Sequence, residues 1–408
     1  MASPRSGPTA TSGALLLLAY LGFVSLGLPD GLLGVGWPAI SGEFEVPIAA
    51  VGFLLAVATA GYLASSVAGG FTIARLGVGR LLTVSTVLAA AALTGYALSS
   101  AYPMLVCLAL LLGLGSGAVD SGLNAYAAAS FGPRHMNWMH AFFGLGVALG
   151  PLIMTTVLQA GLSWRWGYAC VAVAQVALAV AFGLRVDAWG DRAVAASAPA
   201  SAAVPVRETL RLPAVWTGAA AFAMYVAVEV GAGLWAFLLL TRGRGLDAVV
   251  AGGCVSAYWG SLFVGRLVFG LVSERVSGRR VLAGALTAMA VGAGLIALPG
   301  PAPLTVAGLL VLGFSAAPVF PLMTLTTADR VGAAHADRAI GLQIGAAGLG
   351  GAVIPAAIGT VIQQYGVPWL GPALLVASLL LIAQYLAANR GVPATDRDAP
   401  RAVGPVGG

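Results

Sequence analysis

The chain of 408 residues is 59% hydrophobic and only 8% charged, against about 25% charged residues in an ordinary soluble domain. A soluble fold of this length has too little interior to hide so much apolar side chain, and the same apolar content excludes a disordered chain. All 20 basic residues are arginine, so the lysine required by a Walker A loop or a pyridoxal Schiff base is missing. The composition therefore predicts an integral membrane protein that is neither an ATPase nor a pyridoxal enzyme.

Apolar runs of about 20 residues, the length that crosses a bilayer, occur twelve times along the chain. We expect spans at 13–37, 49–71, 80–100, 102–128, 139–161, 165–186, 213–240, 248–272, 280–299, 302–324, 339–362 and 367–388. Residues 1–186 then form an N-terminal six-helix bundle and 213–390 a C-terminal one. The polar segment 187–212 is expected to be a cytoplasmic linker, and 391–408 a disordered cytoplasmic tail.

The arginines predict the orientation of these spans. With the N-terminus in the cytoplasm, sixteen arginines fall on the cytoplasmic side, Arg266 lies inside a span, and Arg165, Arg242 and Arg244 fall outside. Because basic residues accumulate in cytoplasmic loops, we expect a multi-pass protein of the plasma or inner membrane with both termini in the cytoplasm. The arginines are scattered between apolar runs, so the formal charge of +6 does not indicate a nucleic-acid partner.

The two halves of the chain repeat each other at an offset of about 200 residues. Segment 70–80 aligns with 270–280, Leu110–Gly113 with Leu310–Gly313, and 144–151 with 348–355. A duplicated six-helix unit with parallel repeats is the architecture of the major facilitator superfamily. The arginine-containing loops after spans 2 and 8 resemble the signature cytoplasmic loop of that superfamily, although its usual Asp is Ala74 in the first copy and Glu274 in the second.

Within that superfamily the chain resembles the fucose-permease branch of proton–sugar symporters, in segments 115–126, 136–144, 225–237 and 265–266. The resemblance implies a proton-coupled sugar transporter, but it departs from the branch at several polar positions. The branch has Glu at the position of Asp120 and Gln at the positions of His140 and Glu229, and Asp30 lies about one helical turn from its carboxylate in span 1. These changes keep the polar sites and alter their chemistry, so the substrate of the branch does not carry over.

Three acidic residues lie inside expected spans: Asp30, Asp120 and Glu229. An ionised side chain at mid-bilayer costs about 2.5–3.5 kcal/mol on insertion scales, and burial favours the neutral form of a carboxyl group. We therefore expect these groups to face a water-filled cavity or to gain and lose a proton, as proton coupling requires. The alternative for each is a permanently protonated carboxyl that hydrogen-bonds to a neighbouring helix.

Polar side chains beside these acids are the expected substrate contacts. Ser116, Asp120 and Asn124 recur every four residues and share one helix face, which suits the hydroxyl groups of a sugar. A seam of interhelix hydrogen bonds is the alternative. His140 lies one turn inside span 5, where it could titrate or donate to a substrate, or simply bond a neighbouring helix. The full set of expected substrate contacts is Asn124, His140, Ser116, Tyr225, Trp235, Trp37 and Gln343.

Charged residues at the cytoplasmic helix ends are expected to close an inner gate by bonding exposed helix carbonyls and carboxylates of neighbouring helices. The alternative is that these arginines only set the orientation of the helices in the membrane, because the positive-inside rule also places arginines there. These expected gate residues are Arg75, Arg80, Glu274, Arg275 and Arg280.

The sequence thus predicts an all-α membrane protein of two pseudo-symmetric six-helix bundles, working by alternating access. We expect proton-coupled symport of a monosaccharide or a similar small polar metabolite by a monomer without metal or cofactor. The alternative is a proton-coupled exporter of hydrophobic drugs or natural products, which the small number of polar side chains in the spans favours. An intramembrane hydrolase is disfavoured because no G-x-S-x-G motif surrounds Ser116 or Ser121.

Overall fold

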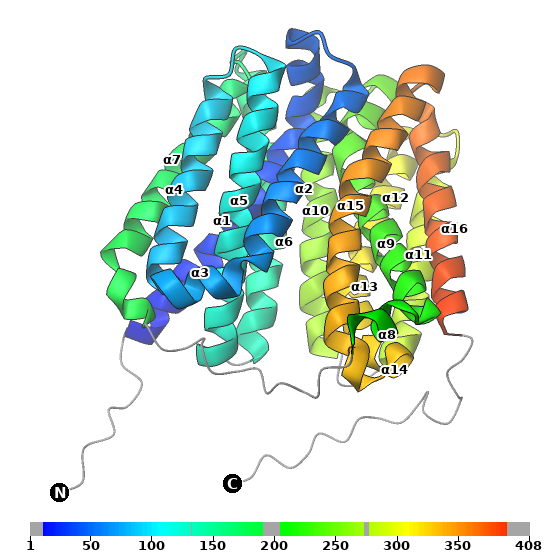
Figure 1. The fold of residues 1–408 in the computed structure, drawn as a ribbon. Helices are drawn as coiled ribbons and strands as arrows, with labels where there is room; N and C mark the ends of the chain where they lie inside the picture. Colours follow the sequence, from blue (N-terminus) through cyan, green and yellow to red (C-terminus); the bar gives the residue numbers. More distant parts are fainter. Residues whose placement is uncertain (1–10, 132, 191–204, 273–276, 390–408) are drawn as a thin grey trace, which may run out of the picture.

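The computed structural model describes residues 11–131, 133–190, 205–272 and 277–389. These ranges contain twelve helices that are long and apolar enough to cross a membrane, and no β-strand. Figure 1 shows two helical bundles side by side, with the short helices α3, α8 and α14 at the end where α1 begins and α16 ends. We call this end the terminal face and the other end the opposite face.

The N-terminal bundle contains six spans. Its helices are α1 (Thr11–Glu43), α2 (Val51–Val67), α3 (Gly69–Leu76), α4 (Val78–Ala97), α5 (Tyr102–Ser130), α6 (Pro133–Gln159) and α7 (Arg165–Leu184). The expected linker begins with a 3-10 turn, η2 (Val186–Trp189), whose buried Trp189 packs against Tyr126 and Phe182 of this bundle. Residues 191–204 of that linker lie outside the described ranges.

The C-terminal bundle repeats the arrangement. Its helices are α8 (Val206–Leu210), α9 (Pro213–Leu238), α10 (Ala248–Val272), α11 (Gly278–Ala297), α12 (Ala302–Ala316), α13 (Val319–Leu325), α14 (Thr327–Val331), α15 (Ala333–Tyr365) and α16 (Leu370–Ala388). Spans 2 and 10 are each divided, into α2 and α3 and into α12 and α13, which the apolar runs alone do not indicate. The expected tail lies beyond the described residues.

Glycines that pack against backbone carbonyls occur at equivalent positions in the two bundles. A methyl group on Gly146 of α6 would overlap the carbonyl of Val24 in α1, and one on Gly350 of α15 would overlap the carbonyl of Ala223 in α9. The same relation joins Gly113 to α2 and Gly313 to α10. Because both pairs follow the predicted repeat, the duplication extends from the sequence to the packing of the helices.

Span 1 is one continuous helix that runs six residues past its expected end at Trp37 and passes through Pro29. Proline lacks the N–H that would bond the carbonyl four residues earlier, which here is the carbonyl of Ser25. The side-chain amide of Gln175 in α7 donates to this carbonyl at 3.1 Å. The helix therefore tolerates Pro29 because a neighbouring helix satisfies the group that the proline leaves unpaired.

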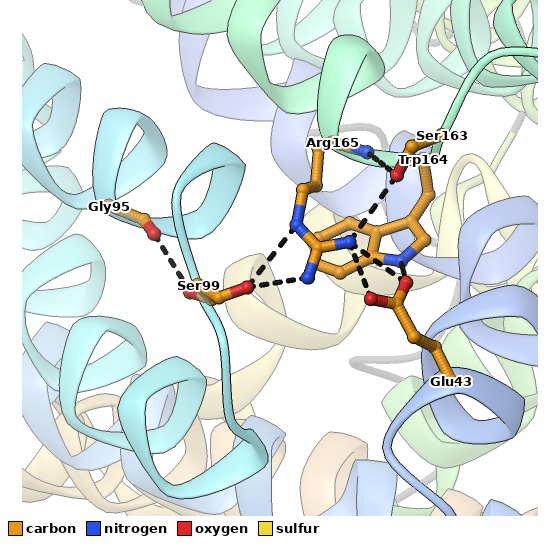
Figure 2. Close-up of polar contacts among 6 residues, drawn as sticks. All are labelled: Glu43, Gly95, Ser99, Ser163, Trp164 and Arg165. Atoms are coloured by element: carbon orange, nitrogen blue, oxygen red, sulfur yellow. Dashed lines mark hydrogen bonds and ion pairs between the residues drawn. The ribbon is translucent and has the colours of Figure 1, made fainter.

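At the opposite face an arginine joins three helix ends of the N-terminal bundle (Figure 2). Arg165 forms an ion pair with Glu43 at 2.7 Å and donates to the carbonyl of Ser99, at the end of α4, from Nε at 3.2 Å and Nη2 at 2.6 Å. Glu43 also accepts from the indole nitrogen of Trp164 at 2.7 Å. We call these four residues the α1 clasp.

A second arginine acts similarly in the C-terminal bundle. Arg244 donates to the carbonyl of Leu298, which follows α11, at 3.0 Å and to the hydroxyl of Thr305 in α12 at 2.7 Å. Three arginines are predicted to lie outside the cytoplasm. Two of them, Arg165 and Arg244, therefore bond residues at or near the ends of neighbouring helices.

The two bundles contact each other along α6 and α10, α2 and α15, and α1 and α9. Near the opposite face, a methyl group on Gly34 of α1 would lie 3.0 Å from the carbonyl oxygen of Gly233 in α9. No comparably extensive contact joins α5 to α12 or α13, all of whose residues are described. In this conformation α1 therefore approaches α9 near the opposite face, while α5 stays apart from α12 and α13.

Candidate functional site

The carboxylate of Asp120 is half-buried on α5 and both of its oxygens accept hydrogen bonds. The hydroxyl of Tyr62 in α2 donates to Oδ2 at 2.7 Å, and Nδ2 of Asn124 donates to Oδ1 at 3.0 Å. Ser116, one turn earlier on the same face, is also half-buried. The expected polar face of span 4 is therefore present, and Tyr62 is a partner that the spacing within span 4 could not reveal.

Asp30 is exposed although it lies midway along α1. It is the only exposed residue between Gly22 and Ser41, all of which the structure describes. Its neighbours one turn away, Leu26 and Leu33, are buried. The carboxyl side chain of Asp30 is therefore left uncovered in a stretch of α1 that is otherwise enclosed by protein.

Glu229 forms a second carboxylate cluster, in the C-terminal bundle. It accepts a hydrogen bond from the hydroxyl of Tyr225, one turn earlier on α9, and that hydroxyl also lies 3.1 Å from the carbonyl of Ala316 in α12. The hydroxyl of Tyr258 in α10 donates to the backbone carbonyl of Glu229 at 2.7 Å. Tyr225 and Tyr258 are both fully buried, so the cluster is held from three helices.

An arginine between the bundles completes the set of charged groups. Nη1 of Arg266 in α10 donates to the carbonyl of His140 in α6 at 3.0 Å, and the same guanidinium interacts electrostatically with Glu229 and with the exposed imidazole of His140. The sequence showed Arg266 as a charge inside a span but gave no partner for it. The free-energy cost of placing a charged side chain in the membrane was the signal in the sequence that could have marked Arg266 as a candidate functional residue.

Three other expected substrate contacts bond within the protein in this conformation. The indole nitrogen of Trp37 donates to the carbonyl of Ile48 at 2.8 Å, and that of Trp235 donates to the carbonyl of Pro355 at 2.9 Å. Gln343 is 1% exposed and accepts from the hydroxyl of Thr327 at 2.9 Å. The two indoles and the acceptor oxygen of the amide are therefore engaged, whereas the side chains of Asp30 and His140 are exposed.

Those expected gate residues that the structure describes lie at the terminal face. Arg75, Arg80 and Arg280 are exposed, and Arg75 stacks on the ring of Phe71 at 4.0 Å. Glu274 and Arg275 lie outside the described residues. Across the described ranges no three His, Cys, Asp or Glu side chains gather in a way that could hold a metal ion.

Twelve helices able to span a membrane, in two related bundles joined by a bond from Arg266, are the architecture of a membrane transporter and not of an enzyme. The chain belongs to the Major Facilitator Superfamily, whose sequence profile matches residues 19–331 and 236–406. This confirms the class and fold that the duplicated sequence predicted.

Individual relatives are distant. The chain is 24% identical over 287 residues to the Protein TsgA homolog of Serratia proteamaculans (strain 568), covering 68% of this chain and 71% of that protein. It is 22% identical over 362 residues to the glucose/mannose transporter GlcP of Bacillus subtilis (strain 168), covering 85% and 88% of the two chains.

Solved structures share the fold at low sequence identity. The nucleoside transporter NupG superposes with a TM-score of 0.77 at 13% identity, covering 92% of this chain and 99% of that one. A peptide transporter, POT, in complex with sulfate has a TM-score of 0.73 at 14% identity, covering 95% and 97%. At this identity the likeness concerns the fold alone.

Proposed function

We propose that the protein is a proton-coupled symporter of a monosaccharide or a similar small polar metabolite. The observation that carries this proposal is the carboxylate of Asp120, which lies inside a spanning helix and is hydrogen-bonded by Tyr62 and Asn124. Such a group can bind and release a proton as the protein changes conformation, because its surroundings differ between the two access states. Asn124 and Ser116 on the same face suit the hydroxyl groups of a sugar.

The choice of a sugar over other polar metabolites is supported by the glucose/mannose transporter among the relatives, which aligns over most of the chain. The resemblance to the fucose-permease branch in segments 115–126 and 225–237 favours the same class. His140 and Glu229 differ from that branch, so we infer that the preferred sugar differs as well.

The direction of opening follows from the orientation that the arginines favour. If the terminal face is cytoplasmic, the contact of Gly34 with α9 closes the protein to the outside, and this conformation faces inward. We infer that Asp30, Asp120 and Glu229 are the protonation sites, that the arginines of the terminal face contribute to the inner gate, and that the protein works as a monomer in the cell membrane.

Uptake into vesicles containing the purified protein tests the proposal. We expect accumulation of one or more radiolabelled monosaccharides when the exterior is acidic, and only equilibration without a pH gradient. A panel of sugars and lipophilic cations, offered with and without the gradient, separates the two candidate functions. Efflux of lipophilic cations without uptake of any sugar would replace the symporter by the exporter.

A further inference from the structure

The hydroxyl of Tyr225 has one hydrogen and two acceptors. It bonds the carboxyl group of Glu229, one turn later on α9, and it lies 3.1 Å from the carbonyl oxygen of Ala316 in α12. A phenol carries a single hydrogen, so it donates fully to one of these acceptors at a time. Tyr225 is 1% exposed, and the two protein groups therefore compete for this hydrogen without solvent.

Ala316 is the last residue of α12, at the break in span 10. Two residues later Pro318 has no N–H to donate, and the amide of Ala317 turns back to the carbonyl of Phe314 at 3.4 Å. The ladder of helix bonds is interrupted here, and a buried carbonyl at a helix end needs another partner. In the described structure the donor to the fully buried Ala316 is the hydroxyl of Tyr225.

The ring of Tyr225 also contacts the helix that follows the break. It lies 6.4 Å from the ring of Phe320 in α13, and Phe320 packs edge to face against Phe222 of α9 at 5.3 Å. Before the break, a methyl group on Gly313 of α12 would lie 2.6 Å from the carbonyl oxygen of Tyr258 in α10. Because these contacts hold the surrounding helices in place, only the hydroxyl hydrogen of Tyr225 has to turn for it to change acceptor.

The proton state of Glu229 decides between the two acceptors. An ionised carboxylate is the stronger acceptor, so it takes the hydrogen of Tyr225 and leaves the carbonyl of Ala316 without this donor. A protonated carboxyl group has an O–H that can donate to the oxygen of Tyr225, whose own hydrogen then bonds Ala316. The one covalent bond that forms is the O–H bond of Glu229, with a proton taken from a hydronium ion, and the tyrosine remains a neutral phenol throughout.

The groups that face Glu229 from α10 are a cation and a second tyrosine. The guanidinium of Arg266 interacts electrostatically with Glu229, and the hydroxyl of Tyr258 donates to its backbone carbonyl at 2.7 Å. The helices α12, α13 and α16 contain no charged residue, the charged residues of α8, α14 and α15 lie at the terminal face, and Arg242, which follows α9, lies at the opposite face. Asp30 of α1 has its electrostatic partners on α2, α4 and α7. Glu229 is therefore the group at this level whose charge changes with pH, and Arg266 balances its ionised form.

We propose that Tyr225 is a positioning residue that links the charge of Glu229 to the break in span 10: an ionised Glu229 holds the tyrosine hydrogen, and a protonated Glu229 releases it to the carbonyl of Ala316. This inference rests on the proposed function, in which Glu229 is a protonation site. Protonation then fastens the end of α12 to α9, and deprotonation loosens the break. Because α13 and α14 lead from the break to the terminal face, the charge of Glu229 acts on the helices that run to the expected inner gate.

Hydrogen–deuterium exchange of the α13 amides, measured on the purified protein in acidic and in alkaline buffer, tests this link. After correction for the intrinsic effect of pH on exchange, the wild type should exchange about fivefold faster when Glu229 is ionised, the factor that one neutral hydrogen bond contributes. Glu229→Gln, whose amide can donate to Tyr225 as the protonated acid does, should exchange slowly in both buffers. Tyr225→Phe should exchange fast in both buffers, alone or combined with Glu229→Gln.

Tyr258→Phe is the matched control. It also removes a buried hydroxyl and an interhelix hydrogen bond beside Glu229, but that hydroxyl bonds neither the carboxyl group nor α12. The pH response of α13 should therefore persist in Tyr258→Phe, and the exchange of α16 should be alike in all variants.

Three results would overturn the link: no pH response of α13 in the wild type, a wild-type response in Tyr225→Phe, or loss of the response in Tyr258→Phe as well. Each of them would leave proton-coupled transport in place. Absence of sugar-driven proton entry in vesicles containing the wild type would instead contradict the proposed function, whether or not α13 responds to pH.

Discussion

Arg266 of α10 donates a hydrogen bond to the backbone carbonyl of His140 of α6, 3.0 Å away, and so joins the two bundles directly. The same guanidinium interacts electrostatically with Glu229. One cation therefore contributes both to the contact between bundles and to the charge balance of the carboxylate in the C-terminal bundle. The arrangement explains why an arginine is retained inside a span, where an unpaired charge costs about 2.5–3.5 kcal/mol.

Removing the charge of Arg266 should destabilise the protein through Glu229. Arg266→Gln leaves that carboxylate without its nearby cation, which we expect to cost on the order of 1–2 kcal/mol. Adding Glu229→Gln removes the uncompensated charge and should restore most of the loss. Thermal unfolding of the purified single and double variants in detergent measures this, and a double variant less stable than Arg266→Gln would contradict the electrostatic link.

The close approach of α1 and α9 at Gly34 should control which face is closed. A side chain larger than hydrogen at Gly34 would press on the carbonyls of Gly233 and Leu234, so Gly34→Leu should favour the conformation open at the opposite face. Spin labels at the exposed positions Ser100 and Gly300, one in each bundle, should move apart by several ångströms.

Gly253 of α10 provides the matched control for this experiment, because a methyl group there would meet nothing within 4 Å. Gly253→Leu should leave the distance between the labels unchanged. An unchanged distance in Gly34→Leu as well would show that the α1–α9 contact does not hold the opposite face closed.

The α1 clasp should depend more on the carbonyl bonds of Arg165 than on its ion pair. The side chains of Arg165 and Glu43 are 25% and 43% exposed, and exposed ion pairs contribute only about 0–1 kcal/mol. Lysine cannot reproduce the two bonds to the carbonyl of Ser99, so Arg165→Lys should lower stability by about 1–2 kcal/mol. Glu43→Gln, which keeps an acceptor for Trp164, should cost less; the reverse order in thermal unfolding would contradict this account.

Single cysteines test the orientation of the whole chain. After the three native cysteines are replaced, a cysteine at exposed Ala188 should react with an impermeant maleimide only in opened cells, because the arginine distribution places this side in the cytoplasm. A cysteine at exposed Glu45 should react in intact cells. Labelling of the Ala188 position from outside would reverse the topology and the side to which this conformation opens.

The spans were predictable because the membrane imposes a length and an apolar composition that are read directly from the chain. Their internal breaks were not, because Ala68 and the Ala317–Pro318 step interrupt helices without interrupting the apolar runs. The end of span 1 at Glu43 was also missed. The residues after Trp37 are less apolar, and it is the α1 clasp, formed by residues 56 or more positions later, that joins the end of this helix to its neighbours.

The acids inside the spans could be singled out from the sequence for the opposite reason, since a carboxyl group in an apolar run is rare and costly. Their partners depend on contacts between helices. Tyr62 lies 58 residues from Asp120, and Tyr258 lies 29 residues from Glu229. Local spacing within one helix found Asn124 and Tyr225, but it contains no information on which face of another helix comes within hydrogen-bonding distance.

The most direct test of the central claim is proton entry into vesicles on addition of sugar, followed with a trapped pH-sensitive dye in the absence of a preset gradient. We predict that the interior of vesicles containing the wild-type protein becomes acidic as the sugar enters. Asp120→Asn, which keeps the shape and hydrogen bonding of the side chain but cannot titrate, should still exchange sugar and produce no acidification. No acidification by any sugar in the wild type, together with release of protons when a lipophilic cation is added, would contradict the symporter and establish the exporter.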